Sequence, residues 1–112
     1  MTSPSHAPKI QYVSADTIRQ LFNESQYPSM IVKGLLIPQQ PYLRDAHLKE
    51  PERKGEPWCT RGQMIRYLDP DGQWVVEVFQ YLRPDGSLGA SGKPDPKRIR
   101  IGSTIFIAES PT

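Results

Sequence analysis

The sequence is poor in cysteine and in long apolar stretches, and both shortages limit the class of protein it encodes. Its one cysteine, Cys59, excludes an internal disulfide framework and is typical of a protein kept in a reducing compartment. No apolar run reaches the roughly 18 residues of a membrane span. The polar first residues, MTSPSHAPK, also lack the apolar stretch of a secretory signal. The sequence therefore predicts a cytoplasmic protein that contacts no membrane.

Hydrophobic residues and net charge are scarce as well. Hydrophobic residues make up 37% of the 112 positions, and 14 basic against 12 acidic residues leave a net charge of only +2. Proline, in contrast, occurs 12 times, about twice its ordinary usage. We expect a disordered terminus over residues 1–9 and one loop-rich domain with a modest core over residues 10–112.

The first half of the chain has one strong helical signal. Ser14 can cap a helix over residues 15–24, in which apolar residues recur at helical spacing and Asp16 suits the helix dipole. The β-branched segment MIVKGLLI predicts a short strand over residues 30–37. Residues 38–62 contain four prolines and many charges, so we expect a long irregular loop, with one helical turn at most, over residues 43–50.

The second half predicts antiparallel strands. Residues 63–82 form a hairpin pattern around the turn Asp-Pro-Asp-Gly, and a second Pro-Asp-Gly turn follows. We expect Gly72 and Gly86 to adopt left-handed conformations there. Residues 98–108 alternate as one strand or as a tight hairpin that turns at residues 102–103.

Alternation divides the hairpin into two faces. The predicted core face contains Trp74, Val76, Val78, Leu82, Ile65 and Tyr67. The opposite face mixes apolar and charged side chains: Gln73, Val75, Glu77, Phe79, Tyr81, Met64, Arg66 and Leu68. Aromatic rings stack on nucleobases and arginine binds phosphate, so Arg66, Phe79 and Tyr81 indicate nucleic-acid binding. The alternative is that the helix over residues 15–24 covers this face and Arg66 forms a cross-strand ion pair with Glu77.

The positive charge is concentrated in the proline-rich segment KPDPKRIR, residues 93–100. Lys93, Lys97, Arg98 and Arg100 oppose only Asp95, which gives a local charge of +3. Prolines keep the backbone extended, and guanidinium groups bind phosphate with bidentate geometry. We interpret this segment as a basic loop that contacts RNA. The alternative is a solvated turn that leads into an edge strand.

The stretch DGSLGASGKPDPKR, residues 85–98, resembles the end of the ribonuclease domain of ribosome-cleaving colicins. In those nucleases a glycine-rich turn follows a twisted sheet, and a tail arginine acts with an Asp, a His and a Glu on the strands. The resemblance implies that Arg98 is the tail arginine and Glu77 the general base of a metal-independent ribonuclease. No histidine lies in this strand of the chain.

No metal or cofactor site is expected. His47 and Cys59 lack the spacing of zinc ligands, and no helix pattern follows the glycines at residues 86–92 to form a phosphate loop.

These patterns together predict an α+β domain in which one N-terminal helix packs on a small antiparallel sheet, with a long irregular loop. As its function we favour a non-catalytic module that binds nucleic acid, RNA in particular. Its predicted contact residues are Lys93, Lys97, Arg98, Arg100, Arg66, Phe79 and Tyr81. The alternatives are the colicin-type ribonuclease and an accessory factor that binds a protein through residues 38–62.

Overall fold

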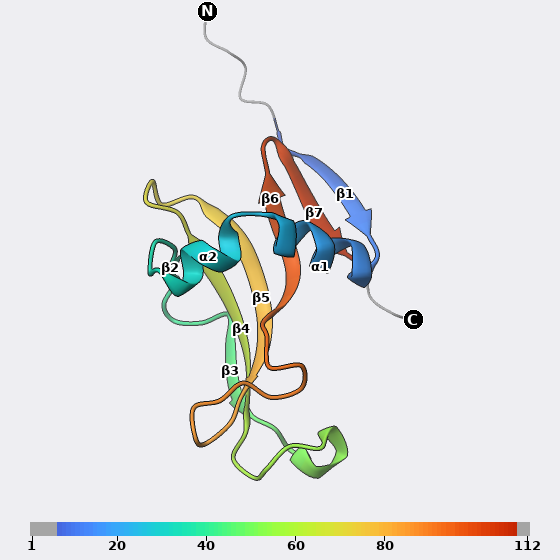
Figure 1. The fold of residues 1–112 in the computed structure, drawn as a ribbon, viewed down its shortest axis with the longest axis vertical. Helices are drawn as coiled ribbons and strands as arrows, with labels where there is room; N and C mark the ends of the chain where they lie inside the picture. The colour runs from blue at the N-terminus through green and yellow to red at the C-terminus, as the bar shows by residue number, and fades with distance from the viewer. Residues whose placement is uncertain (1–6, 110–112) are drawn as a thin grey trace, which may run out of the picture.

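The computed structural model describes residues 7–109, which form an α+β structure built on one twisted sheet (Figure 1). The strands are β1 (Lys9–Val13), β2 (Ile37–Pro38), β3 (Arg44–His47), β4 (Arg61–Leu68), β5 (Trp74–Leu82), β6 (Asp95–Ile101) and β7 (Thr104–Ala108). They lie in the order β1-β7-β6-β5-β4-β2, and β3 also pairs with β4. All the pairs are antiparallel except β1 with β7. The sheet is therefore larger than predicted and not wholly antiparallel.

Three features predicted from short stretches of sequence are confirmed. Helix α1 spans Ala15–Glu24, and the Oγ of Ser14 accepts a hydrogen bond of 3.1 Å from the backbone N–H of Thr17. Gly72 and Gly86 have φ angles of +83° and +88°, as predicted for the two Pro-Asp-Gly turns. Between β6 and β7 the chain turns at Gly102, so the tight hairpin is the correct alternative.

The strand predicted over residues 30–37 is wrong. Helix α2 occupies Tyr27–Val32, and only Ile37 of that segment belongs to a strand. A proline in the first turn starts this helix, and Gly34, with φ +73°, follows its end. Tyr27, Met30 and Ile31 recur at helical spacing and pack against the core. Burial of this face outweighs the β propensity of the β-branched residues.

Residues 38–62 are more regular than predicted. They contain strand β3, paired along β4, and the 3-10 helix η1 (Pro51–Lys54). The single helical turn that residues 43–50 allowed is not there, because β3 lies in that range and the turn comes later, at Pro51–Lys54. Of the terminus predicted to be disordered, residues 1–6 lie outside the described part, and Lys9 begins β1.

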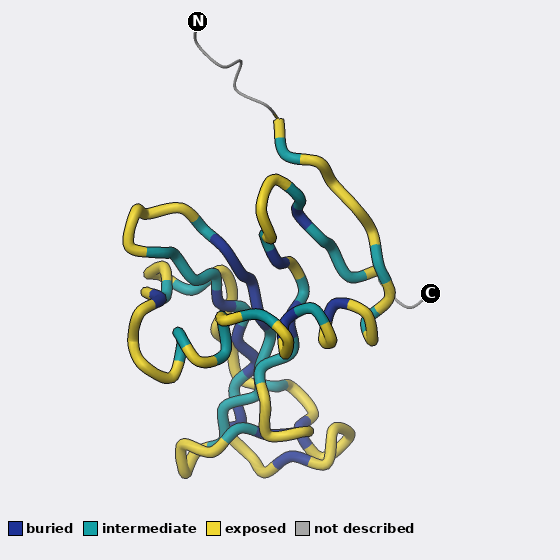
Figure 2. The backbone as a smooth tube through the Cα atoms, turned by 45° about the horizontal axis from the view of Figure 1, so that its top comes forward, coloured by how far each residue is buried: buried dark blue, intermediate teal, exposed yellow. Residues whose placement is uncertain are grey.

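The core lies on one face of the sheet, beneath the two helices. Ile18 and Phe22 of α1 pack with Ile65, Val76 and Ile99 of the central strands, and all five are at most 5% exposed. Figure 2 shows the buried residues concentrated along the middle of the long strands. Within residues 7–109 both α1 and α2 pack against this core cluster, on the face opposite Glu77. The alternative in which residues 15–24 cover the Glu77 face is therefore wrong.

A β-bulge corrects the predicted assignment of Trp74. Leu68 pairs with Trp74 and Tyr67 pairs with Val76, so Val75 is an extra residue in β5. Val75 is 5% exposed and belongs to the core, whereas Trp74 is half-buried and contacts arginines on the Glu77 face. The bulge thus exchanges the faces that simple alternation predicts for these two residues.

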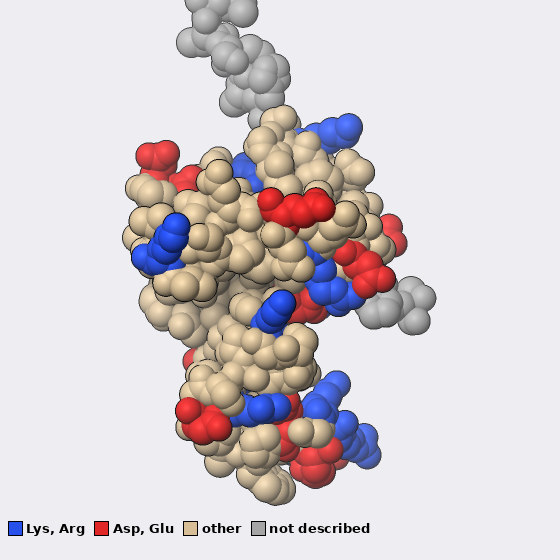
Figure 3. All heavy atoms as spheres, viewed as in Figure 1, with Lys and Arg blue, Asp and Glu red and all other residues tan. Residues whose placement is uncertain are grey.

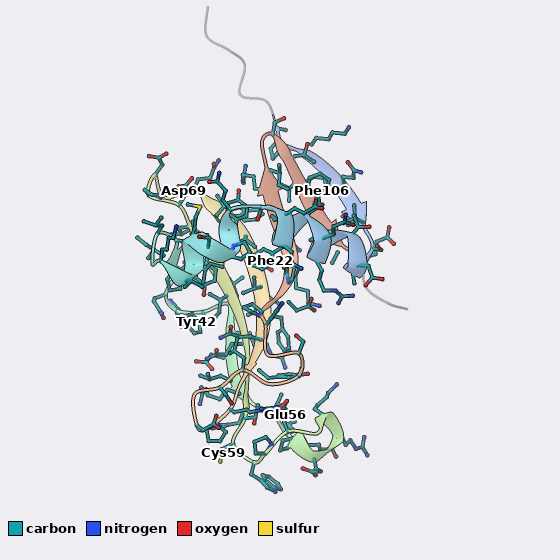
Figure 4. All side chains as sticks on the ribbon, in the orientation of Figure 1. Phe22, Tyr42, Glu56, Cys59, Asp69 and Phe106 are labelled. Atoms are coloured by element: carbon teal, nitrogen blue, oxygen red, sulfur yellow. The ribbon has the colours of Figure 1, made fainter. Side chains whose placement is uncertain are left out.

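The loops at the end of the sheet opposite the β4–β5 turn meet around one carboxylate, that of Glu56, near Cys59 (Figure 4). The Glu56 side chain is 1% exposed and accepts a hydrogen bond of 2.8 Å from Nε of Arg83. It also accepts one of 2.8 Å from the backbone N–H of Ala90, which has a positive φ of 53°. These bonds join three segments that are distant in sequence.

Candidate nucleic-acid interface

The strand register aligns three charged residues across β4, β5 and β6. Arg66 pairs with Glu77, and Glu77 pairs with Arg98 on the other side. Nη2 and Nε of Arg66 donate to Oε2 of Glu77 at 2.9 and 3.3 Å, and Nε of Arg98 lies 3.9 Å from Oε1. The ion pair between Arg66 and Glu77 is confirmed. The carboxylate is shared between the two arginines, one oxygen facing each.

Trp74 and Arg100 extend this row toward the β4–β5 turn. The guanidinium carbon of Arg100 lies 4.8 Å from the centre of the Trp74 ring, and that of Arg66 lies 5.2 Å from it. Nε of Arg100 also donates to the Trp74 carbonyl at 3.1 Å. Behind the sheet, the hydroxyl of Tyr27 donates to the Arg100 carbonyl, and burial raises the pKa of this hydroxyl. Helix α2 therefore anchors the strand that carries Arg100.

We call Arg66, Trp74, Glu77, Arg98 and Arg100 the arginine–tryptophan face. It holds three guanidinium groups and one carboxylate, a local excess of two positive charges. The Arg98 side chain is 47% exposed and that of Glu77 only 9%. Glu77 therefore contacts both arginines from a buried position, while the Arg98 side chain is half-exposed. Elsewhere charges of both signs are mixed, as the side of the molecule in Figure 3 shows.

The other predicted contact residues of β5, Phe79 and Tyr81, lie farther along the strand, away from Trp74. Phe79 and Tyr81 contact each other edge to face, with ring centres 5.2 Å apart. Together with Lys93 and Lys97 they line a pocket beside the helices. Nζ of Lys97 lies 2.8 Å from Asp95. The segment predicted as one basic loop is mostly strand β6, and alternation along that strand separates its charges.

Each oxygen of the buried Glu77 carboxylate has an arginine beside it, Arg66 at Oε2 and Arg98 at Oε1. His47 lies on β3, where its ring is 3.4 Å from Arg61.

Within residues 7–109 no three His, Cys, Asp or Glu side chains cluster in a way that could hold a metal ion. No helix in this part of the chain is long and apolar enough to cross a membrane.

Sequence reasoning missed two important residues. Trp74 was assigned to the core because no local signal marks the bulge at Val75. Glu56 was one charge among many in an irregular segment, and its partners Arg83 and Ala90 come from distant loops. The Asp-Pro-Asp-Gly turn lies close to Trp74, but nothing in its sequence marks an extra residue in β5.

In comparisons with known proteins, no family model, curated protein or solved structure matches the chain. The resemblance of residues 85–98 to the colicin ribonucleases stays a prediction from the sequence.

Proposed function

We propose that the protein is a non-catalytic module that binds single-stranded nucleic acid, RNA in particular, on the arginine–tryptophan face. The observation that carries this proposal is the alignment of Arg66 and Arg98 on both sides of one buried carboxylate, with Trp74 and Arg100 beside them. Guanidinium groups held in this way can donate to phosphate oxygens without losing much side-chain entropy.

Stacking is the second part of the proposed binding. Unpaired bases stack on aromatic rings and on guanidinium planes, and both are present where Trp74 lies between Arg66 and Arg100. The two α-helices of the described residues, α1 and α2, pack against the core on the opposite face of the sheet. A single strand fits better than a duplex, because paired bases do not expose their faces.

The test is a titration of short, labelled single-stranded RNA of mixed sequence, followed by fluorescence anisotropy at several salt concentrations. Arg98→Ala should weaken binding about tenfold, the effect of losing one charge-assisted hydrogen bond. It should also lower the slope of log affinity against log salt by about 0.7 to 0.9. Arg53→Ala is the matched control, because Arg53 is 76% exposed on η1 and lies outside the face.

Trp74 supplies an internal reporter. The structure describes two tryptophans, and Trp58 is 71% exposed in the loop that follows η1. In a Trp58→Phe variant, bound RNA should quench the remaining emission of Trp74. If the wild type binds no RNA at low salt, the proposal is wrong, and the exposed Trp58 in segment 38–62 becomes the place to seek a protein partner. Equal losses in Arg98→Ala and Arg53→Ala would also contradict it.

The ribonuclease alternative is favoured by one contact, the 3.9 Å approach of Arg98 to Glu77. It requires that the purified protein cleave RNA without added metal. It also requires that Glu77→Gln stop cleavage while leaving RNA binding intact. Under our proposal the protein binds RNA without cleaving it. Glu77→Gln then changes the affinity for RNA only because it removes the ion pairs of Arg66 and Arg98 with Glu77.

A further inference from the structure

An open pocket of about 810 Å³ lies between the two helices and the segment that leads into β6. Its lining is mainly apolar and includes Phe22, Ile31, Val32, Phe79, Pro94 and Pro96. Phe22 and Pro96 are buried in its floor, whereas Val32 is 87% exposed. In Figure 4 Phe22 lies at the middle of the molecule, where α1 crosses the sheet.

The size and lining of this pocket match those of a small-molecule site. Such sites commonly measure about 300 to 1,000 Å³ and combine apolar walls with a few polar groups that orient the ligand. The pocket uses none of the residues of the arginine–tryptophan face. A ligand here would therefore not compete directly with nucleic acid on that face.

The charged groups of the pocket are mostly basic. Arg19, Lys93 and Lys97 line it against a single carboxylate, that of Asp95. Asp95 is shared, because Nζ of Lys97 lies 2.8 Å from it and Nη1 of Arg19 lies 3.8 Å from it. Arg19 also pairs with Asp16, which is on the solvent side of α1 and does not line the pocket. The lining thus keeps more positive than negative charge.

We propose that this pocket binds a small amphiphile made of one aliphatic chain and a terminal carboxylate. The chain would lie along Phe22, Ile31 and Phe79 and cover apolar surface that water now contacts. The carboxylate would lie beside Lys93 and Lys97, because Asp16 and Asp95 together neutralise only two of the three basic side chains that line the pocket. The positive charge of the lining repels a ligand with a cationic head group. It adds no binding energy for a ligand whose head group is uncharged.

Three ligands with the same chain and different heads test the proposal: dodecanoate, dodecanol and dodecylamine. Titration calorimetry below the micelle concentration should show dodecanoate binding at least about tenfold tighter than dodecanol, the value of one charge-assisted bond. Dodecylamine should bind most weakly. Equal affinity for the three ligands would overturn the assignment of the head, and no binding of dodecanoate would overturn the site.

Two variants locate the site. Lys97→Gln should reduce affinity for dodecanoate several-fold and leave that for dodecanol unchanged. Val32→Asp places a carboxylate at the exposed rim and should weaken dodecanoate further. Lys33→Gln is the matched control, since Lys33 is exposed next to Val32 but does not line the pocket. An equal loss in Lys33→Gln would show that net charge, not the pocket, controls binding. Circular dichroism confirms that each variant is folded.

Discussion

The carboxylate of Glu56 lies directly against the backbone of Gly89. A Cβ atom on Gly89 would come within 2.3 Å of Oε1 and 2.7 Å of Oε2. The carboxylate cannot easily move away, because Arg83 and the N–H of Ala90 both hold it. Only glycine fits at this position, although its φ is not among the positive values found at other glycines.

Gly89→Ala should therefore destabilise the protein by about 1 to 3 kcal/mol, the usual cost of forcing an extra carbon into a filled site. Urea unfolding measures this cost. The cost should fall in a Glu56→Ala background, where the space is free, and a double-mutant cycle reports the coupling. The same cost in both backgrounds would show that contact with Glu56 is not the cause.

Stability should fall in acid partly through Glu56. Hydrogen bonds from Arg83, and next from the Ala90 N–H, hold the pKa of Glu56 below its ordinary value of 4.5. Since the folded-state pKa is lowered, the stabilisation is complete above the ordinary value and is lost as the pH falls through the folded-state value.

The pH dependence is best measured as a difference, because Arg61 lowers the pKa of Asp45 and Ser87 lowers that of Asp85 as well. The free energy of unfolding of the wild type minus that of Glu56→Gln should be positive at neutral pH. The difference should shrink below pH 4.5. A difference that stays constant between neutral pH and acid would mean that Glu56 has no lowered pKa.

The two faces of the sheet predict different costs for truncation. Ile99 is fully buried, so Ile99→Ala should cost about 2 to 5 kcal/mol. Trp74 is half-buried and lies against Arg66 and Arg100, so Trp74→Ala should cost less, about 1 to 2 kcal/mol. Chemical denaturation compares the two variants. A larger loss for Trp74→Ala would place Trp74 in the core after all.

The turn between β4 and β5 isolates a purely conformational effect. Gly72 has φ +83°, and nothing lies within 4 Å of the position of a Cβ atom. Gly72→Ala should destabilise by about 1 kcal/mol because of its backbone conformation alone. Gly72→Asn should cost less, because asparagine tolerates left-handed conformations. Equal melting temperatures for wild type and Gly72→Ala would contradict this account.

The elements that could be predicted from the sequence are those that a few adjacent residues specify. Ser14 caps α1 through its own neighbours, and the Pro-Asp-Gly turns require a positive φ at Gly72 and Gly86 whatever surrounds them. Alternation was enough to place Arg66 and Glu77 on one face of the hairpin, although the bulge at Val75 sets the register that pairs them. Each of these depends on backbone sterics and hydrogen bonds that span only a few residues.

Tertiary structure alone decided the rest, because it depends on groups distant in the chain. Residues 27–32 form a helix whose Met30 and Ile31 pack against the core. The bulge at Val75 moved Trp74 to the arginine side, and the pairing of β5 with β6 brought Arg98 to Glu77. Burial against distant partners contributes more free energy than local propensity, and no short stretch of sequence contains those partners.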